Sequence, residues 1–220
     1  MPVSNKSFEK SDLLRELAET LKKGRVGIEK ESLRVVNSSL SQKPHPKELG
    51  SALCNRFITT DFSEAQTEFI TPPFKDSHEA LTFLEDIHHF VFLVESEEIL
   101  WPFSCPPLVD EDEIPIAVFG NSNEGKFKHI YRKGLAHRYG KLMQSISGIH
   151  FNYSFHNDLW DHSFFKEADK NLISSKYLGV IRNIMRMNWI ILYLFGASPA
   201  ITKNFITNTN KSLIELDEHV

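Results

Sequence analysis

Cysteine, long apolar runs and clustered basic residues are all scarce in this chain of 220 residues. Its only two cysteines are Cys54 and Cys105, so the sequence argues against a disulfide framework and favours free thiols in a reducing compartment. No run of Lys and Arg stands out, and the net charge is -4. Both observations argue against nucleic acid or an anionic membrane surface as the partner.

A secretory signal and a membrane span are also missing from the sequence pattern. Residues 1–24 are polar and contain no apolar core of the kind that a signal peptide needs. The most apolar stretch, Trp189 to Ile201, is too short to span a bilayer and is interpreted as the buried end of a helix. We therefore expect a cytoplasmic protein with no membrane partner.

The composition is that of an ordinary globular protein, with 41% hydrophobic and 25% charged residues. No internal linker separates two halves, so we predict a single domain over residues 1–220. Residues 204–220 are polar and offer no docking element. We expect this domain to be incomplete, with its C-terminal part truncated.

Hydrophobic periodicity predicts a mixture of helices and strands. Apolar residues recur at helical spacing over residues 11–24, 77–95, 124–143 and 174–195. Strands are predicted at residues 25–36, 57–61, 67–71 and 146–155, and loops at residues 37–52 and 101–115. Strands of the antiparallel type with segregated helices predict the α+β class.

Two acidic residues stand close together in the first predicted strand. Glu29 and Glu31 are two positions apart, so their carboxylates project from the same face. Neighbouring carboxylates raise each other's pKa unless a cation lies between them, and Mg²⁺ prefers oxygen ligands of this kind. A solvated strand face is the alternative, and it is the more frequent explanation of an isolated pair.

The predicted strand at residues 146–155 alternates between a polar and an aromatic face. Its polar side carries Gln144, Ile146, Gly148, His150, Asn152 and Ser154, and its other side carries Ile149, Phe151, Tyr153 and Phe155. This pattern predicts a wall with the core behind the aromatic side and a wet cavity in front. A lone histidine is more often structural than a ligand, but His150 becomes a candidate in the company of Glu29, Glu31, Asp61 and Glu68.

Two motifs approach catalytic signatures and fail at a required position, and one histidine pair could suggest a metal site. Gly120 to Phe127 nearly spells a phosphate-binding loop, but Phe127 replaces the hydroxyl residue that should hold Mg²⁺. His78-Glu79 begins a zinc-protease motif in which Thr82 stands in place of the second histidine. His88 and His89 are adjacent in a predicted helix and cannot both face one metal, so a structural role is favoured.

Several blocks of the sequence resemble bacterial glutamate–cysteine ligases in order and spacing. The blocks are Gly27–Arg34, Thr59–Ala65, Glu68–Pro72, Trp101-Pro102, Gly120–Lys128, Tyr131–Leu135, Arg138–Gly140, Gln144–Asn152 and Leu194–Ala200. Together they extend over roughly residues 20–202. The resemblance implies a curved, mainly antiparallel sheet like that of glutamine synthetase, with helices packed on its outer side.

The resemblance also implies a set of site residues. Glu29, Glu31, Asp61, Glu68 and His150 match positions that hold divalent metal, either magnesium (Mg²⁺) or Mn²⁺. Phe62, Tyr131, Arg132 and Leu135 match the region around the acceptor amino acid, and Arg132 is expected to steady a phosphate or carboxylate during catalysis. Gln144, Ile146 and Asn152 match the wall that receives glutamate.

The implied reaction is the first step of glutathione biosynthesis. ATP is the co-substrate, L-glutamate and L-cysteine are the substrates, and a γ-glutamyl phosphate is the intermediate. Family members are considerably longer, so we expect this chain to be inactive on its own, and we expect a monomer. A truncated non-catalytic fragment and a metal-dependent hydrolase or nuclease using the same carboxylates and histidine are the competing hypotheses.

Overall fold

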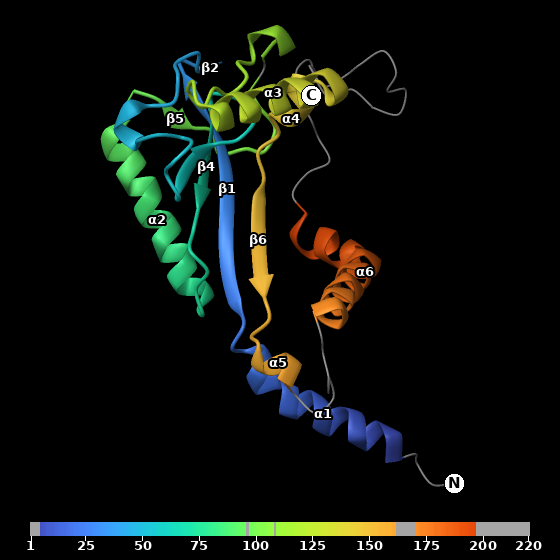
Figure 1. Ribbon diagram of the computed structural model, residues 1–220. Helices are drawn as coiled ribbons and strands as arrows, with labels where there is room; N and C mark the ends of the chain where they lie inside the picture. Colours follow the sequence, from blue (N-terminus) through green and yellow to red (C-terminus); the bar gives the residue numbers. More distant parts are fainter. Residues whose placement is uncertain (1–4, 96, 108, 162–169, 197–220) are drawn as a thin grey trace. The chain divides into compact units, whose positions relative to one another are not determined.

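The computed structural model describes residues 5–95, 97–107, 109–161 and 170–196, which divide into two compact units (Figure 1). The sheet unit consists of residues 26–152, and the helical unit contains the described residues before 26 and after 152. Compact units of this kind can belong to one domain or to two. The single domain over residues 1–220 therefore stays a prediction.

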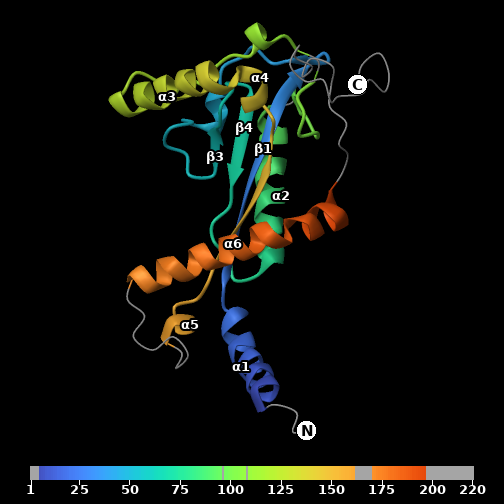
Figure 2. The same cartoon turned by 90° about the vertical axis from the view of Figure 1, so that its right-hand side faces the viewer.

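The sheet unit is built around one long strand, β1 (Arg25–Val36). The other strands are β2 (Ser39–Leu40), β3 (Ile58–Thr60), β4 (Gln66–Ile70), β5 (Ile99–Leu100) and β6 (Ile149–Ser154). The order is β2-β1-β4-β3, and β5 and β6 also pair with β1 (Figures 1 and 2). Strand β1 runs antiparallel to β2, β4 and β5, and β3 runs antiparallel to β4. The predicted α+β fold with a mainly antiparallel sheet is confirmed.

The register of these pairs separates the sheet into two faces. Glu31 is opposite Glu68, and Glu68 is opposite Thr59, so these side chains share the face that we call the front. Lys30 is opposite Phe69 and therefore belongs to the back. Because side chains alternate along a strand, the whole of β1 sends its odd-numbered residues forward and its even-numbered residues back.

Helix α2 (Ser77–Val94) covers the back of the sheet (Figures 1 and 2). The Asp76 side chain caps it by accepting a hydrogen bond from the backbone N–H of His78 at 2.7 Å. Its buried residues follow the helical repeat; they are Ala80, Leu84, Ile87 and Val91. The last three pack in one cluster with Ile58 and Phe69. The helix predicted at residues 77–95 is thus confirmed, and it forms one wall of the core.

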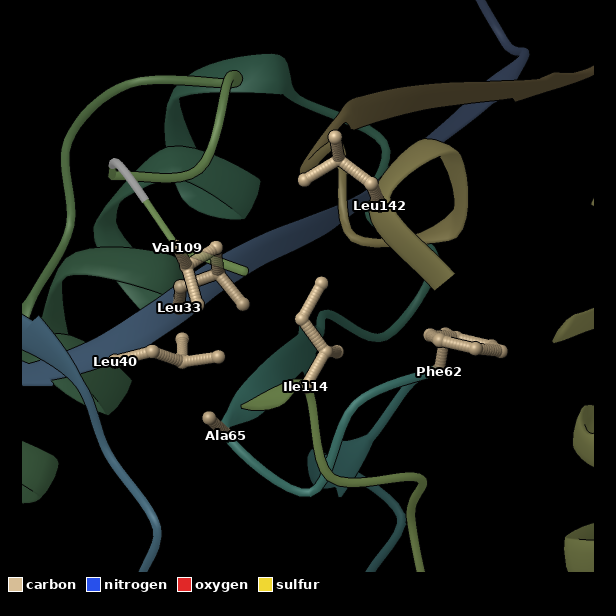
Figure 3. Packing of buried hydrophobic residues seen from close by; sticks show 7 residues of the cluster. All are labelled: Leu33, Leu40, Phe62, Ala65, Val109, Ile114 and Leu142. Carbon is tan, nitrogen blue, oxygen red and sulfur yellow. The ribbon is translucent and has the colours of Figure 1, made fainter. Parts of the chain in front are cut away.

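A second core closes one end of the front face. Figure 3 shows its buried members: Leu33, Leu40, Phe62, Ala65, Val109, Ile114 and Leu142. Leu135 and Ala136 of α3 (Asn123–Tyr139) pack against this group, and Leu142 comes from α4 (Lys141–Gln144). Since Leu33 is two residues beyond Glu31 on β1, the polar part of the front face ends where this core begins.

The helix predicted at residues 124–143 is interrupted once. Ser122 caps α3 by accepting from the N–H of Gly125 at 3.1 Å. Gly140 ends it with a φ of 83°, a left-handed conformation that favours glycine, whereas the helix passes through Gly134. Two short 3₁₀ turns, Lys47–Leu49 and Glu111–Glu113, lie in segments predicted as loops.

The helical unit contains α1 (Asn5–Leu21), α5 (Asp158–Asp161) and α6 (Lys170–Phe195). The Tyr153 hydroxyl donates a hydrogen bond to the carbonyl of Leu21 at 2.7 Å. Phe155, Trp160 and Tyr177 form a ring cluster with centroids 5.4 to 5.9 Å apart. These contacts join α1, α5 and α6 into one unit. The helix predicted at residues 174–195 is confirmed.

Two predictions of burial are wrong for this structure. Ile149 and Phe151, expected to face the core, are 68% and 64% exposed, because the described part of the sheet unit places no layer over that side of β6. Trp189 and residues 191–195 of α6, expected to be a buried helix end, are also exposed, and Ile190 is half-buried. Residues 197–201 of that stretch lie outside the described residues. By length and composition α6 would suit a membrane span, a criterion that core helices of soluble proteins also meet.

Candidate active site

Strand register brings acidic residues together on the front face. Glu31 on β1 lies directly opposite Glu68 on β4, and Glu29 is two residues earlier on the same side. Asp61 follows β3, where its N–H donates to the carbonyl of Gln66 at 3.0 Å and so extends the ladder by one step. Pairing with β4 therefore places carboxylates from three strands in one group, which we call the acidic cluster (Glu29, Glu31, Asp61 and Glu68).

His150 joins the acidic cluster from the other edge of β1. Its Nδ1 lies 3.2 Å from Oε2 of Glu29, so the imidazole of β6 contacts a carboxylate of β1. The sequence placed His150 on the polar side of its strand, and the structure shows that this side faces the acids. Sequence parity alone could not show that β6 lies beside β1.

The carboxylates of the acidic cluster act on one another electrostatically. Burial, followed by the negative charges of Asp61, Glu31 and Glu29, raises the pKa of Glu68 to about 7. Burial also raises the pKa values of Glu31 and Asp61 above their ordinary range, and each has another carboxylate of the cluster as a further cause. The cluster is a place where a positive charge would be strongly favoured.

Arg132 of α3 supports Asp61. Its Nε donates to the Asp61 carbonyl, its Nη1 donates to the carbonyl of Lys128 at 3.2 Å, and its Nη2 lies 3.9 Å from Oδ1 of Asp61. The guanidinium carbon lies 4.5 Å from the ring centroid of Phe119, a cation–π contact. These contacts hold the cation beside the acidic cluster.

The donor set fits a hard divalent cation chemically. Carboxylate oxygens suit Mg²⁺ and Mn²⁺, and an imidazole nitrogen suits Mn²⁺ as well. Among the residues that the structure describes, no three His, Cys, Asp or Glu side chains already surround a single point as a bound metal would require. Binding would therefore require side-chain rotation within the cluster. The assignment of these five residues as metal ligands stays a prediction.

The predicted substrate residues lie in different surroundings. Tyr131 is exposed on α3, and Leu135 on the same helix is half-buried against the front core. Phe62 is only 2% exposed, so its ring would support a substrate from beneath rather than touch it.

The residues predicted to receive the glutamate substrate do not all lie on the predicted strand. β6 begins at Ile149, so Gln144 ends α4 and Ile146 lies in the connecting loop, whereas Asn152 is exposed on β6 itself. The common face expected for Gln144, Ile146 and Asn152 therefore does not follow from strand parity. Their roles in binding glutamate stay predictions.

Sequence reasoning missed two partners of Glu31. The side-chain amide of Gln66 and the backbone N–H of Gly148 both donate to Oε2 of this carboxylate, at 3.2 and 2.9 Å. A signal for Gln66 existed, because it stands two residues before Glu68 on the same strand and so shares its face. Gly148 contributes through its backbone, which leaves no signal in residue type.

Comparisons with known proteins identify the family of the chain. A family model described as glutamate-cysteine ligase matches residues 12–220. The glutamate–cysteine ligase of Alcanivorax borkumensis is 44% identical over 208 residues, which cover 92% of this chain and 40% of that protein. That of Pseudomonas entomophila is 50% identical over 198 residues, 87% of this chain and 37% of that protein.

Solved structures show the same similarity in three dimensions. A crystal structure of glutamate–cysteine ligase from Francisella tularensis in complex with AMP has a TM-score of 0.83 at 40% identity, covering 90% of this chain and 40% of that one. A bifunctional glutathione synthetase from Pasteurella multocida has a TM-score of 0.76 at 32% identity, covering 86% of this chain and 25% of that one. The chain thus spans about 40% or less of the length of these relatives. With its sequence and its fold both matched, this chain belongs to the glutamate–cysteine ligase family.

Proposed function

We propose that this chain supplies the cation site and part of the substrate site of an ATP-dependent ligase. The enzyme would join the γ-carboxylate of L-glutamate to the amine of L-cysteine, the first step of glutathione biosynthesis. The observation that carries the proposal is the acidic cluster with His150 beside it, in a chain 44% identical to a protein named for this reaction. The AMP bound to the Francisella relative supports an adenine nucleotide as co-substrate.

The chemistry explains why ATP is needed. A carboxylate does not accept an amine, so the γ-carboxylate oxygen first attacks the terminal phosphorus of ATP, forming an acyl phosphate and releasing ADP. The amine of cysteine then attacks the acyl carbon, and phosphate leaves with the bonding electrons. The balance is ATP, glutamate and cysteine giving ADP, phosphate and γ-glutamylcysteine. This route needs no covalent nucleophile from the protein, so neither cysteine is assigned a role.

The proposed roles of the cation-site residues and of Arg132 are different. Glu29, Glu31, Asp61, Glu68 and His150 would hold Mg²⁺ or Mn²⁺, which supplies positive charge against the phosphate oxygens. Arg132 binds the backbone carbonyl of Asp61 through Nε and places Nη2 3.9 Å from its carboxylate. Its remaining charge favours a nearby phosphate or carboxylate.

The substrate side follows from α3 and β6. Tyr131 and Leu135 would border the acceptor amino acid, with Phe62 supporting them from the core. Gln144, Ile146 and Asn152 would form the wall that receives glutamate. We further propose that the complete enzyme is cytoplasmic and monomeric and that neither nucleic acid nor membrane is its partner.

The experiment restores the length that the relatives have. The 220-residue chain is fused to the part of the Alcanivorax ligase that follows the aligned region, and ADP release is measured with ATP and Mg²⁺. ADP release that requires both glutamate and cysteine supports the ligase. ADP release with neither amino acid would favour a hydrolase, and a folded fusion that releases no ADP would contradict the proposal.

Two controls accompany the fusion. Glu31→Gln in the fusion is expected to lower turnover on the order of 100-fold, because the divalent cation beside the phosphates loses one of its carboxylate ligands. Lys43→Met, at an exposed position, is the matched variant that should retain turnover. The unfused chain is expected to show no turnover, and a measurable rate from it would contradict the view that the remaining length is needed.

A further inference from the structure

A buried glutamine underlies the acidic cluster and joins three segments of the sheet unit. Gln66, at the start of β4, is 0% exposed. Its Nε2 donates to Oε2 of Glu31 at 3.2 Å and to Oγ of Ser147 at 3.4 Å, and its Oε1 accepts from the N–H of Ser63 at 3.4 Å. Both amide hydrogens and the carbonyl oxygen are therefore engaged.

The loop before β6 reaches the same carboxylate. The N–H of Gly148 donates to Oε2 of Glu31 at 2.9 Å, and the N–H of Glu31 donates to the carbonyl of Gly148 at 3.0 Å. With Gln66, two donors converge on one oxygen of Glu31. A carboxylate oxygen offers about two lone-pair sites, so Oε2 has little capacity left and Oε1 remains for another partner.

We propose that Gln66 is a positioning residue that holds the Glu31 carboxylate so that only Oε1 is presented to a cation. This inference rests on the proposed function, because it assigns Glu31 to the cation site. Gln66 would make Glu31 a ligand through one oxygen and would limit the rotation of its side chain. Both effects favour a small cation with strict geometry over loose binding.

The same glutamine connects the cation site to the substrate wall. Ser145 and Ser147 are buried, and their N–H groups donate to the carbonyls of Lys141 and Ser104 at 3.1 and 2.9 Å, so the loop is fixed on both sides of Ile146. Gln66 contacts Ser147 and Glu31 with the two hydrogens of one amide group. Gln66 therefore adds a side-chain link between the carboxylate and the loop that would receive glutamate, beside the two hydrogen bonds that join Glu31 to Gly148.

A merely structural role for Gln66 makes a different prediction. In that case the glutamine fills space and satisfies the N–H of Ser63, and its loss would lower stability without changing cation affinity. Gln66→Leu removes all three hydrogen bonds at similar volume, whereas Ser147→Ala removes one and leaves the contact with Glu31. These two variants form a matched pair.

The first measurement is the affinity of the 220-residue chain for Mn²⁺, followed by the electron paramagnetic resonance signal of free Mn²⁺. Gln66→Leu is expected to weaken binding about 10-fold, the effect of losing a group that orients a ligand. Ser147→Ala is expected to stay within about twofold of the wild type, because the Glu31 contact persists. Equal affinities for the wild type and Gln66→Leu would overturn the inference.

The second measurement needs no metal and no core variant. The side-chain amide protons of Gln66 are followed by NMR in the presence of a chelator, and Glu31→Gln is expected to shift them while Lys43→Met does not. Unshifted protons in Glu31→Gln would overturn the inference. A wild-type chain that binds no Mn²⁺ would count against the proposed cation site, and the amide protons would then decide the positioning role by themselves.

Discussion

The two faces of β1 differ in whether their acidic side chains are paired with a cation. On the back, Arg34 donates to Glu98 at 2.6 Å with both side chains 1% exposed, and Ser41 donates to the same carboxylate at 2.5 Å. On the front, Glu31 lies opposite Glu68, and burial together with neighbouring carboxylates raises the pKa of both. Folding pairs Arg34 with Glu98 within the chain, whereas the front face keeps an excess of negative charge. The strand thus combines a buried ion pair on one face with a cluster of carboxylates on the other.

Breaking the back-face pair should have the largest effect on stability. Arg34→Met removes the guanidinium and leaves Glu98 buried without its cation, which typically costs about 3–5 kcal/mol. Arg34 also donates to the carbonyls of Lys43 and Glu64, so the loss extends to two loops. The measurement is the free energy of unfolding in urea, followed by circular dichroism.

The control for this prediction is the double variant Arg34→Met with Glu98→Leu. Removing both charges is expected to be less damaging than removing the arginine alone, because no unpaired charge remains. If the double variant were as unstable as the sum of the two single variants, the ion pair would not be the origin of the loss.

Removing a negative charge from the front face should stabilise the fold, in contrast to breaking the back-face pair. The pKa of Glu68 is about 7 in the folded chain against an ordinary value of 4.5, so the folded state binds the proton more tightly than the unfolded state. Glu68 therefore lowers stability as pH rises from about 4.5 to 7, and the full cost is present above 7. We expect Glu68→Gln to raise the free energy of unfolding at pH 8, without metal, by roughly 1–2 kcal/mol after allowance for solvent screening.

The pH dependence provides the check on Glu68. The gain from Glu68→Gln should shrink toward zero near pH 4, where the wild-type carboxyl is protonated in both states. Unfolding curves in a chelator at both pH values test this. A variant that is destabilised at pH 8 would show that Glu68 contributes to the fold, contrary to the contrast between the two faces.

The smallest effect is expected at an exposed pair near the buried one. Lys43 lies 2.8 Å from Glu97, and both side chains are largely exposed. Lys43→Met should leave the free energy of unfolding almost unchanged, because water and salt screen such pairs. Urea unfolding of this variant and of Arg34→Met shows how much burial adds to the contribution of an ion pair to stability. If Lys43→Met lost as much stability as Arg34→Met, burial would not distinguish the two pairs.

Local patterns in the sequence predicted the elements well and part of the site. The common face of Glu29 and Glu31 follows from the two-residue repeat of a strand, and the register confirms it. The position of Glu68 opposite Glu31 depends on how β1 pairs with β4, which no local pattern contains. Only the resemblance to a family brought these residues together before the structure did.

The errors have physical causes too. The strand predicted from residue 146 begins at Ile149, because Ser145 and Ser147 are buried and bonded to the carbonyls of Lys141 and Ser104. Alternation showed that Ile149 and Phe151 share a side of β6, but it could not show whether anything covers that side. The pairing of Arg34 with Glu98 left no signal, since the two residues are far apart in sequence.

The alternation along β1 has a consequence for how this segment can change. Inserting one residue after Glu31 would reverse the orientation of everything that follows, sending Leu33 toward α2 and taking Arg34 away from Glu98. In the middle of the strand a substitution keeps this orientation, whereas an insertion or a deletion of one residue does not. A change in length is easier to accommodate in the turn beyond the strand, because it leaves the register of β1 with β4 unchanged. In that turn Asn37 and Ser38 adopt φ values of 49° and 65°, a left-handed conformation that glycine adopts without strain.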